Sequence, residues 1–283
     1  MEGTKGEKTC VKRGTLGLWR GLGAVSLACL LLLLAGFGWA LKDHWAPSAG
    51  MAVPEASGPP AAAGGSLAAK PAWKIAALGD SLTVGTGDST GSGYVKRAAE
   101  VLAESLDKQV RIVNNLAIGG LRADQLLAQL GDTGYVNAIV QSDIVMLTIG
   151  GNDLFQFASG NGSLVEGGDI SPEQLERHLP EGERRLGEVL GELRRMNAVA
   201  RIVYVGLYNP FFDLPDMRAD ASRIVRAWND YAADFAAKDG NMTVVPTYDL
   251  FEASIGKYLS SDHFHPNDEG YARIAERVVQ ALN

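Results

Sequence analysis

Residues 76–83, with the sequence AALGDSLT, decide how the rest of this chain is interpreted. The mostly apolar run over residues 73–78 predicts a short buried strand, and Gly79 permits the sharp turn that ends it. Ser81 follows that turn, and in open α/β sheets ligands bind just beyond the carboxyl ends of the strands. Ser81 is therefore a candidate nucleophile, although serine is also a preferred helix N-cap, and capping is the simpler interpretation of this residue taken alone.

Length and composition indicate a globular protein with an acidic folded part. The 283 residues suffice for one large domain or two small ones. The net charge is −7; the first 41 residues carry five Lys/Arg against two Asp/Glu, and residues 42–70 carry two of each, so the remainder carries −10. A domain this acidic predicts no nucleic-acid partner and no basic patch for anionic lipid. Cys10 and Cys29 both precede the folded part, where we therefore expect neither a disulfide framework nor a cysteine metal site.

The N-terminal region has the features of a membrane-inserted segment. Residues 1–20 are polar and net basic, which predicts a cytoplasmic n-region, and residues 21–41 contain no charged side chain. This apolar run is long enough to span a bilayer as a helix and places the bulk of the chain on the extracytoplasmic side. An uncleaved signal anchor is favoured over a secretory signal cut after Ala40, because the run exceeds a typical signal core. Lipidation at Cys29 is disfavoured, because that cysteine lies in the middle of the run.

Residues 42–71 are rich in Ala, Pro, Gly and Ser and predict a flexible linker before a folded domain over residues 72–283. Within that domain, strand and helix patterns alternate, which predicts βαβ units and a parallel sheet with right-handed crossovers. The expected strands cover residues 73–78, 110–114, 144–149, 200–206 and 243–246. The expected helices cover residues 94–106, 121–130, 173–196, 216–238 and 267–282.

Two features interrupt this alternation. Pro180 is expected to break or restart the long helix over residues 173–196, because proline removes a backbone donor from a helix interior. Residues 160–169 are rich in glycine and predict a mobile loop that follows the third strand beside the site.

Four short polar or glycine-rich stretches fall at expected strand ends or directly before the last helix. They are GDSL at residues 79–82, NLAIGG at 115–120, GGND at 150–153 and DHFHP at 262–266. Because the carboxyl ends of parallel strands meet at one edge of a sheet, all four stretches are expected to converge there.

These four stretches, in this order, resemble the SGNH/GDSL hydrolase family of esterases and lipases, in the form of an extracytoplasmic bacterial GDSL-like lipase/acylhydrolase. The resemblance spans residues 72–283. It implies a three-layer α/β/α flavodoxin-like fold with a five-stranded parallel sheet in the order 2-1-3-4-5. It also implies hydrolysis of carboxylic esters with no cofactor and no metal.

The resemblance assigns a role to five residues. It implies that Ser81 is the nucleophile, that His265 is its base, and that Asp262 is the partner of the histidine. It implies that the Gly120 backbone N–H and the Asn152 side chain join the Ser81 N–H as oxyanion donors. These residue types suit the chemistry, because a serine hydroxyl needs a base, a neutral imidazole can take its proton, and a carboxylate orients the imidazole. Donors fixed in advance stabilise the oxyanion without reorganisation.

The second stretch departs from the family pattern. Gly119 and Gly120 are adjacent, so the donor is ambiguous, and counting from Asn115 favours Gly120. Leu121 and Arg122 follow, where small polar residues are common in relatives, so the wall that faces the substrate is expected to differ.

Other polar residues near the motifs have simpler interpretations. Asp80 is expected to shape the turn and Asp153 to cap a helix or brace a loop. His263 could join Asp262 and His265 in a metal site, but no ligand beyond these is evident. His178 is expected to be a solvated surface residue.

The sequence therefore predicts a membrane-tethered or secreted serine esterase acting on a lipid, a lysophospholipid or an O-acetylated saccharide. The loop over residues 209–212 is expected either to line an acyl pocket or to pack as an ordinary loop. Acyl transfer to a cell-wall sugar and a non-catalytic binding module on the same fold are the alternatives. The oligomeric state is left open.

Overall fold

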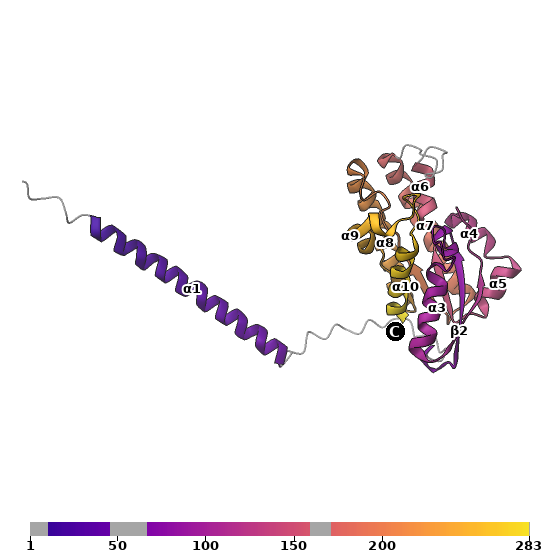
Figure 1. Ribbon diagram of the computed structural model, residues 1–283, viewed down its shortest axis with the longest axis horizontal. Helices are drawn as coiled ribbons and strands as arrows, with labels where there is room; N and C mark the ends of the chain where they lie inside the picture. Colours follow the sequence, from indigo (N-terminus) through magenta and orange to yellow (C-terminus); the bar gives the residue numbers. More distant parts are fainter. Residues whose placement is uncertain (1–10, 46–66, 159–170, 283) are drawn as a thin grey trace, which may run out of the picture. The chain divides into compact units, whose positions relative to one another are not determined.

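The computed structural model describes residues 11–45, 67–158 and 171–282 (Figure 1). The chain divides into two compact units, Met1–Ser57 and Gly58–Asn283. The predicted loop at 160–169 and most of the predicted linker lie outside the described residues.

The N-terminal unit contains one long helix, α1 (Val11–Trp45). Its stretch Trp19–Gly38 is long and apolar enough to cross a membrane, and its side chains are exposed. A signal sequence near the N-terminus can meet the same criterion of length and hydropathy. The helix continues through Trp45, so the first four residues of the predicted linker at 42–71 are helical.

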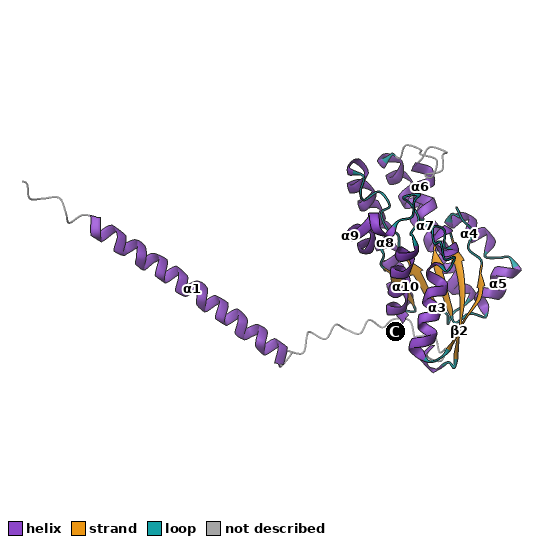
Figure 2. Ribbon diagram, in the orientation of Figure 1, coloured by secondary structure: helices purple, strands orange, loops and turns teal. Residues whose placement is uncertain are grey.

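The second unit is built on five parallel strands in the order β2-β1-β3-β4-β5, as predicted. Figure 2 shows the strands in orange among the purple helices of this unit. Each strand lies within two residues of its predicted bounds. The strands are β1 (Ala72–Gly79), β2 (Gln109–Asn115), β3 (Ile144–Thr148), β4 (Arg201–Val205) and β5 (Met242–Val245).

Helices cover both faces of this sheet because the strands bury side chains in both directions. Val145 and Leu147 pack into one core, whereas Ile144 and Met146, on the opposite face of β3, pack into the other. The first core is closed by α4 (Ala123–Gln129), α5 (Thr133–Val140), α6 (Gly151–Ala158), α7 (Pro172–Met196) and α8 (Pro215–Asp239). The second is closed by α3 (Gly93–Leu106), α9 (Tyr248–Tyr258) and α10 (Asp268–Leu282). The three-layer α/β/α architecture is therefore confirmed.

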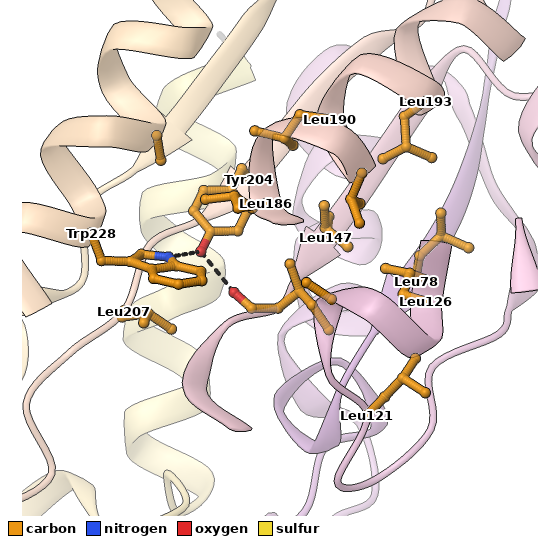
Figure 3. Packing of buried hydrophobic residues seen from close by; sticks show 14 of the residues in the cluster. Leu78, Leu121, Leu126, Leu147, Leu186, Leu190, Leu193, Tyr204, Leu207 and Trp228 are labelled. Carbon is orange, nitrogen blue, oxygen red and sulfur yellow. Dashed lines mark hydrogen bonds between the residues drawn. The ribbon is translucent and has the colours of Figure 1, made fainter. Parts of the chain in front are cut away.

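The first core contains a hydrogen-bonded pair that supports the turn between β3 and α6. Trp228, fully buried on α8, donates its indole N–H to the Tyr204 hydroxyl at 2.7 Å. Tyr204 in turn donates to the backbone carbonyl of Ile149 at 2.7 Å (Figure 3). Aromatic side chains of β4 and α8 thus hold the turn that leads into α6.

The helix prediction at Pro180 is wrong. Helix α7 runs through Pro180 without interruption, although proline leaves the carbonyl four residues earlier without its helical donor. Leu175 and Leu186, which lie on either side of it, are both fully buried in the same core. Tertiary packing therefore holds both halves of the helix in line.

Candidate active site

Ser81 is positioned by a turn that only glycine can make. Gly79 has φ +122°, and a Cβ at this position would lie 1.8 Å from the carbonyl oxygen of Thr148. Asp80 follows as the N-cap of the short helix α2 (Ser81–Val84), accepting from the Leu82 backbone N–H at 3.1 Å. Asp80 therefore shapes the turn as predicted, and Ser81 is the first residue of the helix and not its cap.

A buried chain of hydroxyl groups stands behind this turn. The Thr148 hydroxyl donates to Asp80 Oδ1 at 2.7 Å and lies 2.7 Å from the Thr83 hydroxyl, which lies 2.9 Å from the hydroxyl of Tyr94. Burial raises the pKa of Asp80, against the opposing effect of the hydrogen bonds from Thr148 and the Leu82 N–H. Sequence reasoning missed Thr148 and Tyr94, which carry no motif signal of their own.

The structure brings Ser81, His265 and Asp262 together at the carboxyl edge of the sheet. His265 Nε2 lies 2.8 Å from Ser81 Oγ, although the two residues are 184 positions apart. His265 Nδ1 lies 2.7 Å from Asp262 Oδ2. Ser81 and His265 are both buried, at 7 % and 8 % exposure. The arrangement can move a proton from the hydroxyl to an imidazole whose other nitrogen faces a carboxylate.

The loop before α10 holds Asp262 ionised. Its Oδ1 accepts from the Ser260 hydroxyl at 2.8 Å and from the backbone N–H groups of Phe264 and His265, both at 2.9 Å. Burial raises the pKa of Asp262, but the hydrogen bonds from the His265 side chain, these N–H groups and Ser260 outweigh it and lower the pKa to about 2. The carboxylate is therefore charged at neutral pH.

Gly120 and Asn152 lie on two segments that are hydrogen-bonded to each other. The Leu121 N–H donates to the Ile118 carbonyl at 3.2 Å, and Gly120, at the third position of this turn, has φ +78°. A type II turn requires such a φ at this position, which explains the glycine. Asn152, in the first turn of α6, donates from Nδ2 to the carbonyl of Leu121 at 3.0 Å.

A small pocket beside Ser81 has largely apolar walls. Phe264 forms one wall, edge-on both to His265, with ring centroids 5.1 Å apart, and to Phe155, at 6.0 Å. Pro210 of the 209–212 loop lines the pocket, whereas Phe211 packs behind it against Phe155. The lining residues are Asp80, Ser81, Leu82, Thr148, Gly151, Asn152, Phe155, Leu207, Tyr208, Pro210 and Phe264.

The other polar residues that the sequence analysis considered lie outside this arrangement. His263 is exposed. His178, on α7, was predicted to be a solvated surface residue but is half-buried. Asp153 accepts from the Ala123 backbone N–H at 2.9 Å, as expected of a helix cap or loop brace. Within the described residues, no three His, Cys, Asp or Glu side chains are grouped so that they could hold a metal ion.

Gly150, between β3 and α6, allows a prediction about how much a larger side chain at this position would destabilise the fold. It has φ +116°, and a Cβ here would lie 2.1 Å from the Trp228 ring. We expect Gly150→Ala to destabilise the fold by about 2–6 kcal/mol, the sum of backbone strain and overpacking, and to be visible as a large drop in thermal midpoint. Gly134→Ala is the control, because a Cβ at Gly134 meets nothing within 4 Å and alanine favours its helix. Equal midpoints for the two variants would contradict the geometry.

Comparisons with known proteins agree with this fold. A family model described as the GDSL-like lipase/acylhydrolase family matches residues 77–273, and the chain belongs to that family. The protein is thus a carboxylic ester hydrolase of the GDSL esterase and lipase type.

Relatives and solved structures extend over most of the chain. It is 37 % identical over 213 residues to YpmR of Bacillus subtilis, covering 74 % of this chain and 80 % of that one. It is 27 % identical over 215 residues to the spore germination lipase LipC of Bacillus licheniformis, covering 72 % and 94 %. Its fold matches that of the lipase Lip_vut3 from a goat rumen metagenome, with a TM-score of 0.63, 24 % identity, and coverage of 74 % and 97 %. Its fold also matches that of an acetyl xylan esterase from Geobacillus stearothermophilus, with a TM-score of 0.55 and 21 % identity. That match covers 75 % of this chain and 94 % of the esterase.

Proposed function

We propose that this protein hydrolyses carboxylic esters through an acyl-enzyme formed on Ser81. The observation that carries the proposal is the continuous series of contacts from Ser81 Oγ to His265 Nε2 and from His265 Nδ1 to Asp262 Oδ2. In this proposal His265 is the base, and Asp262 fixes the imidazole tautomer and stabilises the imidazolium. The Ser81 N–H, the Gly120 N–H and the Asn152 amide stabilise the oxyanion.

The proposed reaction has two halves. In the first, His265 Nε2 takes the proton of Ser81 while Oγ attacks the ester carbonyl, and the imidazolium then gives that proton to the departing alkoxide. In the second, His265 takes a proton from water, whose oxygen attacks the acyl-enzyme, and returns it to Ser81 Oγ as the carboxylic acid leaves. Each half forms one C–O bond, breaks another and restores the neutral imidazole, so no cofactor is consumed.

The pocket and the relatives support an ester with an apolar acyl group, drawn from lipids, lysophospholipids or O-acetylated saccharides. The pocket next to Ser81 is lined by the apolar side chains of Phe155, Leu207, Pro210 and Phe264. We further propose that residues 21–41 anchor the enzyme in the cell membrane with the domain over residues 72–283 on the extracytoplasmic side. The length and apolar character of Trp19–Gly38 and the basic residues before it support this placement.

A fluorophosphonate probe tests the nucleophile directly. We expect the probe to label the wild-type protein at one serine and peptide mass spectrometry to place the adduct on Ser81, because only a serine paired with a base reacts readily. The Asp262→Asn variant should react with the probe far more slowly. When the wild-type protein acts on an ester at neutral pH, analysis of the products should show the free carboxylic acid and not an acyl-sugar. An adduct on any other serine would end the proposal.

A further inference from the structure

The first turn of helix α6 holds the segment that follows Gly120 from two sides. Asn152 Nδ2 donates to the carbonyl of Leu121 at 3.0 Å. The next residue, Asp153, accepts from the Ala123 backbone N–H with both carboxylate oxygens, at 2.9 and 3.2 Å. Two successive side chains of one helix thus fix a carbonyl and an N–H that lie two residues apart on another segment.

The other end of the same turn is fixed to the central strand. The Ile118 N–H donates to the carbonyl of Gly79 at 2.9 Å, two residues before Ser81. The backbone at Gly120 therefore lies between a hydrogen bond to β1 on one side and the hydrogen bonds to α6 on the other. Removal of the hydrogen bonds to α6 would leave the turn fixed at one end only.

Asp153 supplies a cap that helix α4 does not provide for itself. The N-cap residue of α4 is Arg122, whose guanidinium only donates hydrogen bonds and therefore cannot accept from the first N–H groups of the helix. Gln125 of the same helix accepts from the Arg122 N–H at 3.0 Å and not from that of Ala123. The acceptor comes instead from a residue 30 positions later. This contact ties the start of α4 to the start of α6, the two elements beside the proposed oxyanion donors.

We propose that Asp153 is a positioning residue for the oxyanion site, setting the distance between the Gly120 N–H and the Asn152 amide by holding Ala123. The proposal rests on the proposed function, since it concerns donors that act in the same reaction. Pre-organised donors lose effect steeply when they are displaced, because their stabilisation of the transition state depends on fixed geometry. A loosened turn therefore lowers the rate of the chemical step and leaves ground-state binding of the ester largely unchanged.

The burial of Asp153 supports a specific task. Its side chain is 2 % exposed, and the Arg122 and Arg185 guanidinium groups and the Asp124 carboxylate are the charges that act on it. Burial raises the pKa of Asp153 to about 7, against the opposing effect of the Ala123 N–H. A neutral or charged carboxyl group at this position keeps an oxygen that accepts from Ala123, and an asparagine keeps one as well.

Three variants of the full-length protein test the proposal. Asp153→Ala removes the acceptor, Asp153→Asn keeps it without charge, and Ala123→Pro removes the donor at the first helical position, where proline is tolerated. Asp124→Asn is the matched control, because it removes a neighbouring charge in the same first turn without touching the contact. Rates with p-nitrophenyl acetate are divided by the number of sites that a fluorophosphonate titrates, so that unfolded protein does not count.

We expect Asp153→Ala and Ala123→Pro to lower kcat per titrated site by about 10- to 100-fold with KM within about threefold of wild type. Asp153→Asn and Asp124→Asn should stay within about threefold of wild-type kcat. A lower thermal midpoint with unchanged kcat per site in Asp153→Ala would reduce Asp153 to a structural cap and overturn the proposal. Equal losses in Asp153→Ala and Asp153→Asn would overturn it too, because charge and not the acceptor would then matter. A wild-type protein that neither hydrolyses the ester nor reacts at Ser81 would instead overturn the proposed function.

Discussion

Ser81→Ala is expected to lose a factor of about 10³ or more in kcat/KM for p-nitrophenyl acetate, because removal of a triad nucleophile leaves only binding and oxyanion stabilisation. The Ser81 hydroxyl lies 2.8 Å from His265 Nε2. Alanine fits the first turn of α2, so the thermal midpoint should change little. Steady-state rates and a thermal melt on the same preparation measure both quantities.

Ser92→Ala is the matched control for this variant. Ser92 precedes α3 and makes no side-chain capping hydrogen bond, so its loss removes a serine hydroxyl without disturbing the site. It should retain wild-type activity. If Ser81→Ala hydrolysed the ester as fast as Ser92→Ala, another group would have to be the nucleophile.

His265→Ala is expected to lower the rate by a factor of about 10³ or more, as for other members of a catalytic triad. His263, two residues earlier, is exposed and has φ +54°, a conformation that asparagine adopts more readily than most residues. His263→Asn should therefore retain wild-type activity. Comparable losses in both histidine variants would mean that the loop, and not the imidazole at 265, is what the reaction needs.

The acid limb of the pH profile has to be assigned to His265 and not to Asp262 or Asp153. The pKa of Asp262 is lowered to about 2 from an ordinary 3.8, so its contribution to stability is present above 3.8 and is lost only as the pH falls towards 2. A fall in kcat/KM between neutral and mildly acidic pH therefore does not report Asp262. Burial raises the pKa of Asp153 to about 7, so the profile must be repeated on Asp153→Asn. We expect the acid limb to persist in that variant and to be absent from the residual activity of His265→Ala.

The sequence was sufficient to predict the sheet, because most of the strands are short apolar runs bounded by turn residues. The strand order followed from the family resemblance and not from the runs themselves. The proximity of Ser81 to His265 could also be predicted, since both follow or precede elements that end at the same edge of a parallel sheet.

The helices and side-chain contacts were less predictable. Residues 133–140 and 248–258 form helices that lack a long apolar period, and α2 and α6 begin inside the motifs themselves. The continuity of α7 through Pro180 depends on core packing that no local pattern encodes. The hydrogen bond between the Ala123 N–H and Asp153 joins residues 30 positions apart. The sequence indicated only that Asp153 would cap a helix or brace a loop, without naming its partner.

The separation of Ser81 and His265 along the chain has a consequence for biosynthesis. At about 5–20 residues per second, a ribosome adds the intervening 184 residues in roughly 10–40 s, and α10, which packs on α3, comes later still. Throughout that interval the nascent polypeptide carries a serine without its imidazole. Under the proposed mechanism, hydrolytic competence therefore arrives in one late step, and a nascent chain that lacks His265 cannot cleave esters.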